Sequence, residues 1–274
     1  MHLAFARLLL ATEHTEFDVG AEAAAFALAA EPGVALSAVV PLVSNVEYET
    51  VAPELVARAE AEAYARSQAV RAAAAAAGLT VDVRVRRAEE GWRAIVGEAT
   101  DVAADLLVAR RRGRRGFLAN FMVGEMVNRM TINAPCHVLI VPRKATLPRT
   151  RVLAGIDASR AGPVVAGLAA RAAKAAGLPL TLVGVAADRA ERAMVERALA
   201  AAAEAARAEV GDVTVEVAEG RAAETVAAKA AEAGADLVVV GRGGSPTHGL
   251  RLRLGGNAYR IVGLVPCAVL VVRP

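Results

Sequence analysis

The sequence contains a long internal repeat. Residues 104–143 recur without a gap 131 positions later, as residues 235–274, and thirteen of the forty aligned pairs are identical. The identical pairs include Asp105/Asp236, Arg111/Arg242 and Cys136/Cys267. A period of this size is too long for a solenoid unit and matches a whole domain. The repeat therefore predicts one domain-sized unit used twice.

The duplication predicts two domains, residues 1–143 and 151–274, joined by a polar linker at residues 144–150 (KATLPRT). A chain of 274 residues agrees with this number, and each half is long enough to bury its own core. Because 55% of the residues are hydrophobic and only 3% are aromatic, the packing must rely on alanine, valine and leucine.

Short apolar runs alternate with helical segments in both halves. Strands are expected at residues 5–11, 34–40, 81–85, 106–109, 138–141, 151–156, 180–185, 213–217, 237–240 and 268–272. Helices are expected up to about residue 30 and at residues 53–77, 92–103, 162–176, 190–209 and 223–233, with a short one before the last strand. Such alternation is typical of a parallel sheet covered on both faces. Each half is therefore predicted to be a doubly wound α/β domain.

Glycines and one acidic residue of the second half stand where a ligand would bind. In an open α/β sheet, ligands lie beyond the carboxyl ends of the strands, where the strand order reverses. Asp157 follows the first strand and can accept hydrogen bonds from a ribose hydroxyl or a base amine, although residues 157–159 (DAS) also suit a helix N-terminus. Gly241 begins a glycine-rich loop after the fourth strand, and a helix starting near Gly256 would direct free N–H groups at an anion. The arrangement favours a nucleotide over a plain strand–helix turn.

Both halves resemble the universal stress protein family over almost the whole chain. The resemblance rests on residues 152–159 (VLAGIDAS), 219–222 (EGRA) and 235–272 in the second half, and on residues 8–15 and 133–141 in the first. It implies a Rossmann-like, adenine nucleotide alpha hydrolase-like fold, with five parallel strands in the order 3-2-1-4-5 in each half. It also implies that the last strands pair, so that the halves form a pseudo-twofold dimer within one chain. The exposed apolar edges of those strands agree.

Family members that bind ATP carry the motif G-x2-G-x9-G-[S/T] after strand four and an aspartate after strand one. By this resemblance the cofactor is ATP, with or without Mg²⁺, in the second half only. The implied binding residues are Asp157, Val185, Gly241, Gly244, Gly255, Gly256 and Asn257. The backbone of Val185 would meet the adenine.

Two departures from the motif are present. The spacer before Gly255 has ten residues rather than nine, and Gly256 stands where the hydroxyl residue belongs. The missing hydroxyl removes a hydrogen bond to phosphate worth about 1.5–3 kcal/mol. The backbone amides of Gly256 and Asn257 are the donors that can compensate.

The first half departs further from the motif. Glu13 stands near the aspartate position, Arg110 replaces the first glycine, and Glu125 replaces the hydroxyl residue. A carboxylate at the helix start would repel a phosphate and occupy the anion site itself. We therefore expect no ATP in this half.

The basic block at residues 110–115 (RRRGRR) has three interpretations. It could be a solvated loop whose arginines pair with Glu125, Glu13 or the other half, a site for a small anion, or a nucleic-acid patch. Apart from Phe117, no aromatic residues interleave with it, so stacking platforms for nucleic acid are absent. The first interpretation is favoured, and no nucleic-acid partner is expected.

Other residues suggest no further chemistry. The four histidines lack the spacing of metal ligands, and Ser159 and Ser245 lack a His/Asp arrangement that would activate them. Cys136 and Cys267 each follow a proline before an apolar run, which indicates buried thiols rather than a disulfide framework. A reducing cytoplasm is therefore the expected location. No apolar stretch is long enough to suggest a membrane span.

The sequence thus predicts a cytoplasmic tandem protein that binds an adenine nucleotide in its second half as a regulatory ligand. It is not expected to be an enzyme, and any ATP hydrolysis would be slow and incidental. The alternative is an ATP-independent scaffold in which both sites have decayed, as Gly256, the longer spacer and Glu125 would suggest. Two such chains could associate further into a homodimer.

Overall fold

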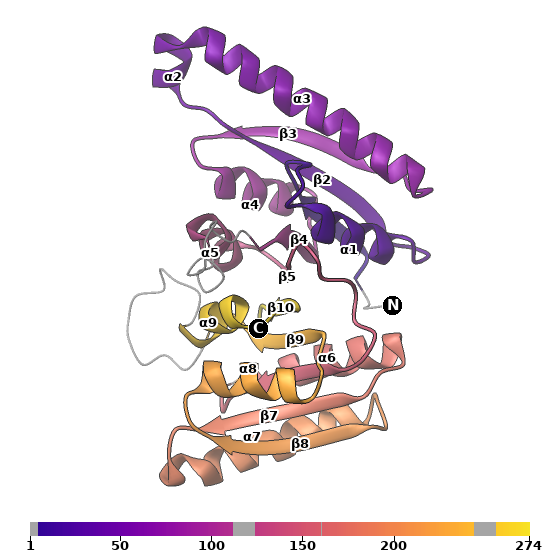
Figure 1. Ribbon diagram of the computed structural model, residues 1–274, viewed down its shortest axis with the longest axis vertical. Helices are drawn as coiled ribbons and strands as arrows, with labels where there is room; N and C mark the ends of the chain where they lie inside the picture. Colours follow the sequence, from indigo (N-terminus) through magenta and orange to yellow (C-terminus); the bar gives the residue numbers. More distant parts are fainter. Residues whose placement is uncertain (1–4, 112–123, 160, 244–255) are drawn as a thin grey trace.

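One continuous sheet of ten strands forms the centre of the protein (Figure 1). The computed structural model describes residues 5–111, 124–159, 161–243 and 256–274. Within these residues the strands follow the order β3-β2-β1-β4-β5-β10-β9-β6-β7-β8. Each half therefore contributes five neighbouring strands in the order 3-2-1-4-5, as expected.

The elements of the first half are β1 (Arg7–Ala11), α1 (Val19–Ala29), β2 (Ala35–Val43), α2 (Val46–Val51), α3 (Pro53–Ala76), β3 (Asp82–Ala88), α4 (Gly91–Asp101), β4 (Leu106–Arg110), α5 (Glu125–Asn133) and β5 (His137–Val141). Those of the second half are β6 (Val152–Ile156), α6 (Gly162–Ala176), β7 (Leu180–Ala186), α7 (Arg189–Arg207), β8 (Val213–Glu219), α8 (Ala222–Glu232), β9 (Leu237–Gly241), α9 (Gly256–Leu264) and β10 (Ala268–Val272). The short helix α2 has no counterpart in the second half and was not predicted.

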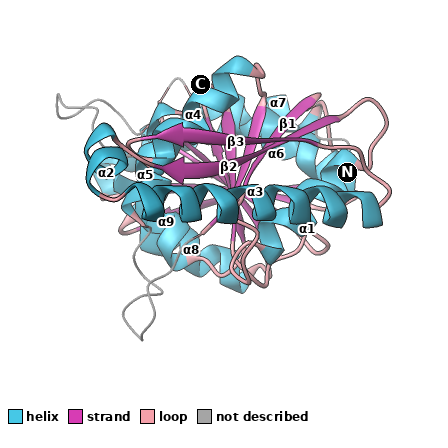
Figure 2. Ribbon diagram, turned by 90° about the horizontal axis from the view of Figure 1, so that it is seen from above, coloured by secondary structure: helices cyan, strands magenta, loops and turns pink. Residues whose placement is uncertain are grey.

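Helices cover both faces of the sheet (Figure 2). One apolar cluster joins the sheet to α1, α3, α6 and α7, and the other joins it to α4, α5, α8 and α9. Alanines make up much of the helical side of both clusters, and their small side chains let the helices lie close to the strands. None of the helices in the described part of the chain is long and apolar enough to cross a membrane.

The two halves are joined through their last strands. β5 and β10 pair antiparallel, with Leu139 opposite Leu270, while the strands within each half run parallel to one another. The β5–β10 pairing, here called the seam, removes two apolar edges that would otherwise be free to pair with other chains. Figure 1 shows α5 and α9 next to the seam on the same face of the sheet, and residues of both helices belong to the same apolar cluster.

Identical residues of the repeat hold equivalent positions in the two halves. The carboxylate of Asp105 accepts hydrogen bonds from the backbone N–H groups of Ala6 and Arg7, at 2.8–3.1 Å. Asp236 does the same at the start of β6, for the N–H groups of residues 149–151, at 2.6–3.2 Å. Each aspartate thereby fixes the beginning of the central strand of its half.

The two cysteines are buried and free, as expected for small apolar residues. Cys136 is 6% exposed and Cys267 is 8% exposed. Burial raises the pKa of each thiol to about 11, so both remain protonated near neutral pH.

Candidate functional site

The strand order reverses once in each half, at the carboxyl ends of the central strands. β1 lies between β2 and β4, and β6 lies between β7 and β9. The chain leaves these central strands for one side of the sheet and returns on the other, which opens a crevice at each reversal. The two crevices are equivalent by the repeat, so their contents can be compared directly.

In the second half, Asp157 follows β6 and is exposed. Its Oδ1 accepts hydrogen bonds from the backbone N–H of Ser159, at 3.1 Å, and from the Ser159 hydroxyl, at 2.5 Å. No described residue bonds to its Oδ2. The side chain is thus held in place by one oxygen and presents the other to solvent.

Residues 157–159 do not cap α6 as the sequence suggested. The helix begins later, at Gly162, and its N-cap residue Ala161 makes no side-chain cap. Instead, Asp157 and Ser159 form a turn of their own, in which the Ser159 hydroxyl accepts the N–H of Ala161 at 3.2 Å. Asp and Ser side chains commonly form such local turns by hydrogen bonding to backbone N–H groups two residues on.

Gly241 ends β9 beside the start of α6. A Cβ added there would lie 3.5 Å from the Cβ of Ala161 and 3.6 Å from a methyl of Val165, both of which are ordinary contacts. Packing therefore does not require a glycine at this position. Gly241 has no side chain that could enter the crevice at the carboxyl end of β9. Gly244 and Gly255 lie outside the described residues.

Gly256 and Asn257 begin α9, and both are exposed. The first turn of α9 carries no acidic side chain, so the N–H groups at this end face no competing carboxylate from their own helix. Val185, near the end of β7, is partly buried and packs against the apolar cluster that contains α8 and α9. The ends of β6, β7 and β9 are neighbours in the sheet, so Asp157, Val185 and Gly241 lie at the same edge.

In the first half, Arg110 occupies the position of Gly241 and fills the crevice. Its guanidinium donates hydrogen bonds to Glu13 Oε2 at 2.6 Å, Asp18 Oδ2 at 2.6 Å and Thr15 Oγ1 at 2.8 Å. Arg110 is only 5% exposed and Asp18 only 1%. A buried cation bound by two carboxylates therefore stands where the second half has a glycine. We call Arg110, Glu13, Asp18 and Thr15 the arginine cluster.

A second group of polar residues closes the same edge. The Thr12 hydroxyl donates to Glu22 Oε1 at 2.6 Å, and His14 Nδ1 lies 3.1 Å from the same oxygen. The hollow that remains among Thr12, the arginine cluster and the apolar residues of α4 and α5 is about 20 Å³. Ligand pockets usually measure about 300–1,000 Å³. This hollow has room for little more than water.

The role expected for Glu125 needs correction. Its side chain is 76% exposed and bonds to Arg129 at 2.8 Å, one turn further along α5, and makes no cap at the helix start. A Glu–Arg pair four residues apart is favourable on a helix surface, which explains this orientation. The crevice of the first half is therefore filled by the arginine cluster and not by Glu125.

The basic block is only partly described, since Arg112, Arg114 and Arg115 lie outside the described residues. Arg110 is buried rather than solvated, although it pairs with Glu13 as expected. Arg111 reaches the other half, where its Nη1 donates to the carbonyls of Val262, at 2.9 Å, and Val265, at 2.5 Å.

An equivalent contact runs from the second half to the first. Arg242, the counterpart of Arg111, donates from Nη1 to the carbonyl of Ala134 at 2.9 Å. Each arginine thus serves carbonyls at the C-terminal end of the last helix of the other half, groups that a helix leaves unpaired. Burial lowers the pKa of both guanidinium groups, which nevertheless remain charged.

Sequence reasoning missed Asp18, the buried partner of Arg110. An acid at the start of the first helix and an arginine at the end of the fourth strand would have been the available signal, because both positions border the crevice. A contact of the basic block with the other half was among the expectations, and Arg111 makes it, but the equivalent contact of Arg242 was missed. Within the described residues, no group of three or more His, Cys, Asp or Glu side chains is placed to hold a metal ion.

Two doubly wound domains with the strand order 3-2-1-4-5, joined edge to edge, define a tandem Rossmann-like α/β protein. The universal stress protein family matches residues 4–142 and again residues 148–273. The chain therefore belongs to the universal stress protein family and contains two of its domains.

Solved structures of low sequence identity share the fold. A universal stress protein from Archaeoglobus fulgidus is 19% identical, with a TM-score of 0.72 over 97% of this chain and 96% of its own. A functionally unknown protein from Pseudomonas aeruginosa PAO1 is 16% identical, with a TM-score of 0.69 over 99% of this chain and 94% of its own. A universal stress protein in complex with cAMP is 25% identical over 46% of this chain and 98% of its own, with a TM-score of 0.41. No curated protein matches the chain.

Proposed function

We propose that this tandem universal stress protein binds an adenine nucleotide, ATP with or without Mg²⁺, in its second half only. The observation that carries the proposal is the contrast between equivalent positions at the two crevices. Arg110 fills the first with a buried ion-paired side chain, whereas Gly241 leaves the second free of one. The proposed binding residues are Asp157, Val185, Gly241, Gly244, Gly255, Gly256 and Asn257.

The proposed roles follow from the chemistry of each group. The free Oδ2 of Asp157 accepts a hydrogen bond from a ribose hydroxyl, and the backbone of Val185 meets the adenine. The N–H groups at the start of α9, beside Gly256 and Asn257, receive phosphate oxygens, helped by the positive end of the helix dipole. Because no hydroxyl stands at position 256, we expect affinity about tenfold to a hundredfold weaker than with a hydroxyl present.

We propose a regulatory role for the nucleotide and no turnover. A nucleotide that binds the folded protein raises its stability and favours one conformation of the loops around the crevice. The cytoplasm is the location that we propose, with the stress response as the setting.

Isothermal titration calorimetry of the full-length protein with Mg-ATP tests the proposal. We expect measurable binding, with affinity at least tenfold weaker for Asp157→Ala, because the ribose loses its acceptor. Asp212→Ala is the matched control, since Asp212 is an exposed aspartate of the same half on the loop before β8. Its affinity should equal that of the unaltered protein. cAMP, the ligand named for one similar structure, serves as a second probe.

A further variant tests the contrast between the crevices. Gly241→Arg places in the second crevice the side chain that fills the first, and we expect it to abolish ATP binding while the fold is retained. Absence of heat at millimolar nucleotide with the unaltered protein would refute nucleotide binding and favour the ATP-independent scaffold. Steady ATP hydrolysis that disappears in a Gly244 variant would refute a purely regulatory role.

A further inference from the structure

An open hollow lies beside the seam, at the amino-terminal ends of the strands of the first half. Its volume is about 680 Å³, within the usual range of ligand sites. The lining residues are Phe5, Ala104, Asp105, Pro135, Cys136, His137, Leu168, Arg171, Arg273 and Pro274. Both halves contribute to it, and it lies at the opposite ends of the β1 and β4 strands from the crevice of the first half.

The charges that line this hollow are unevenly compensated. Arg171 and Arg273 form no ion pair with any described carboxylate, and both are exposed. The nearby Asp105 is already engaged by the N–H groups of Ala6 and Arg7, and therefore does not pair with them. Of the side chains that line the hollow, two are guanidinium groups and one is a carboxylate, and Nη1 of Arg273 also donates to the carbonyl of Pro135.

His137 adds a fixed donor to the hollow. The backbone N–H of Arg273 donates to His137 Nδ1 at 3.0 Å, so this nitrogen carries no proton and the neutral ring has its hydrogen on Nε2. Burial, and next the charge of Arg171, lower the pKa of His137, which keeps the ring neutral near pH 7. The ring also lies 5.8 Å from that of Phe5, centroid to centroid.

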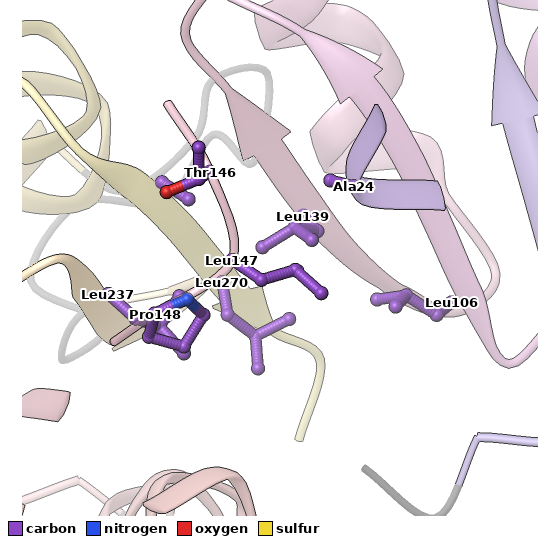
Figure 3. Close-up of a pocket in the computed structure, with 9 residues that line it drawn as sticks. Ala24, Leu106, Leu139, Thr146, Leu147, Pro148, Leu237 and Leu270 are labelled. Atoms are coloured by element: carbon purple, nitrogen blue, oxygen red, sulfur yellow. The ribbon is translucent and has the colours of Figure 1, made fainter. Parts of the chain in front are cut away.

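The repeat provides a comparison on the other side of the seam. There the linker residues Thr146, Leu147 and Pro148 cover the equivalent surface and leave a cavity of only about 10 Å³ (Figure 3). The side chains beneath this linker are apolar, with Ala268 at the position of His137 in the repeat and Ala24 at that of Leu168.

The two sides of the seam differ in the charge of their side chains as well as in whether the linker covers them. β1 pairs with β4 in the first half as β6 pairs with β9 in the second, and this alignment of the halves places Ala27 at the position of Arg171. By the repeat, Pro142 corresponds to Arg273. The fold itself therefore requires neither arginine. Arg171 and Arg273 therefore have no cationic counterparts on the side that the linker covers.

We propose that this hollow is a binding site for a small organic anion, a phosphate or carboxylate attached to an apolar group. The guanidinium groups of Arg171 and Arg273 bind the anionic oxygens, for which their planar N–H pairs are well shaped. His137 Nε2–H supplies a further donor, and Phe5 and Leu168 contact the apolar part. The site is independent of the proposed nucleotide site at the carboxyl end of β6.

Phenyl phosphate is a suitable probe because it has both parts of the ligand. Titration into the full-length protein, followed by NMR of the histidine ring protons, should shift the His137 signal. The chain has four histidines, so the signal can be assigned with His137→Gln. Benzoate, inorganic phosphate and phenol, titrated in parallel, separate carboxylate from phosphate recognition and measure the contribution of the apolar part. Phenol should not shift the signal.

Variants then identify the groups that bind. Arg171→Gln and Arg273→Gln should each weaken phenyl phosphate about tenfold or more in calorimetry. Arg197→Gln, an exposed arginine on α7 in the same half, is the matched control and should leave the affinity unchanged. Circular dichroism melts of the variants confirm that the fold is retained.

Two results would overturn the proposal. One is an unchanged His137 signal at millimolar phenyl phosphate and benzoate. The other is binding that persists in both Arg171→Gln and Arg273→Gln, or that falls equally in Arg197→Gln. Asp157→Ala should leave phenyl phosphate binding intact, so failure here is distinguishable from failure of the nucleotide proposal.

Discussion

At the scale of single residues, the two halves reach the same backbone conformation with different side chains. Ala103 and Gly234 are counterparts in the repeat, and both have positive φ, 48° and 62°. Each follows a helix, and the next residue donates its N–H five residues back, from Ala104 to Ala99 and from Ala235 to Ala230. This is the Schellman ending of a helix, which favours glycine because the left-handed conformation crowds a Cβ.

Exchange of these residues should therefore change stability in opposite directions. We expect Gly234→Ala to lower the free energy of unfolding by about 1 kcal/mol, and Ala103→Gly to raise it by up to about 1 kcal/mol. The nearest atom to a Cβ at Gly234 is 3.9 Å away, so the effect arises from φ and not from a clash. Urea denaturation followed by circular dichroism measures both. Ala233→Gly, where φ is −80°, should be destabilising, and a stabilising result there would contradict the explanation.

At the scale of elements, the arginine cluster ties the end of β4 to the loop and helix that follow β1. Arg110 on β4 bonds to Glu13 in that loop and to Asp18 at the N-cap of α1, and so joins segments more than 90 residues apart in the sequence. A buried ion pair adds little net stability compared with apolar residues, because its charges are removed from water. Loss of one partner is costly, because the other charges stay buried.

We expect Arg110→Met to lower the free energy of unfolding by about 3–5 kcal/mol, since Asp18 and Glu13 lose their cation. The triple variant Arg110→Met, Glu13→Gln, Asp18→Asn should recover a large part of this loss, because it removes the uncompensated charges. Chemical denaturation at neutral pH measures the series. Arg143→Met is the control, because the Arg143–Glu16 pair is more than half exposed and should contribute less than about 1 kcal/mol. Equal losses for Arg110→Met and Arg143→Met would show that burial does not matter here.

At the scale of the whole molecule, the halves are joined by backbone pairing and by two reciprocal arginines. β5 and β10 form the seam, and Arg111 and Arg242 cross it to carbonyls at the ends of α9 and α5. The arrangement is that of an isologous dimer, in which each contact occurs twice, although one chain supplies both sides. Association of two chains into a homodimer stays a proposal, and sedimentation velocity tests it.

Replacement of the two arginines tests how the halves are held together. Arg111→Met and Arg242→Met should each cost about 1–3 kcal/mol of stability, because buried carbonyls lose a charged donor. The two sites are separate, so the double variant should lose the sum to within about 0.5 kcal/mol. Arg129→Met and Arg260→Met are the controls. These arginines are also identical in the repeat, but their ion pairs lie at the surface and should contribute less than about 1 kcal/mol each.

Much of the fold was predictable because it depends on local patterns. The expected bounds of α6 and β10 agree with the structure, and those of most other elements differ by a few residues. Strand and helix are recognisable from apolar runs, alanine-rich segments and the glycines between them. Helix α2 was missed because it is short and has no apolar periodicity. Asp157, Gly241 and Gly256 were predictable as candidates from their positions at strand ends and at a helix start, whereas Val185 and Asn257 came from the family resemblance. The binding role of all five stays a prediction.

The sequence by itself determined that one α/β unit occurs twice, that its strands run parallel, and that the glycine at the end of the fourth strand, Gly241, is present in the second copy only, where the first copy has Arg110. These properties follow from short-range pattern and from direct comparison of the two copies. Only the tertiary structure decided that Arg110 binds Asp18, that Arg111 and Arg242 cross the seam, and that the linker covers one side of it while the other side is open. Those outcomes depend on which distant segments the folded sheet brings together, and no local pattern in the chain encodes such a contact.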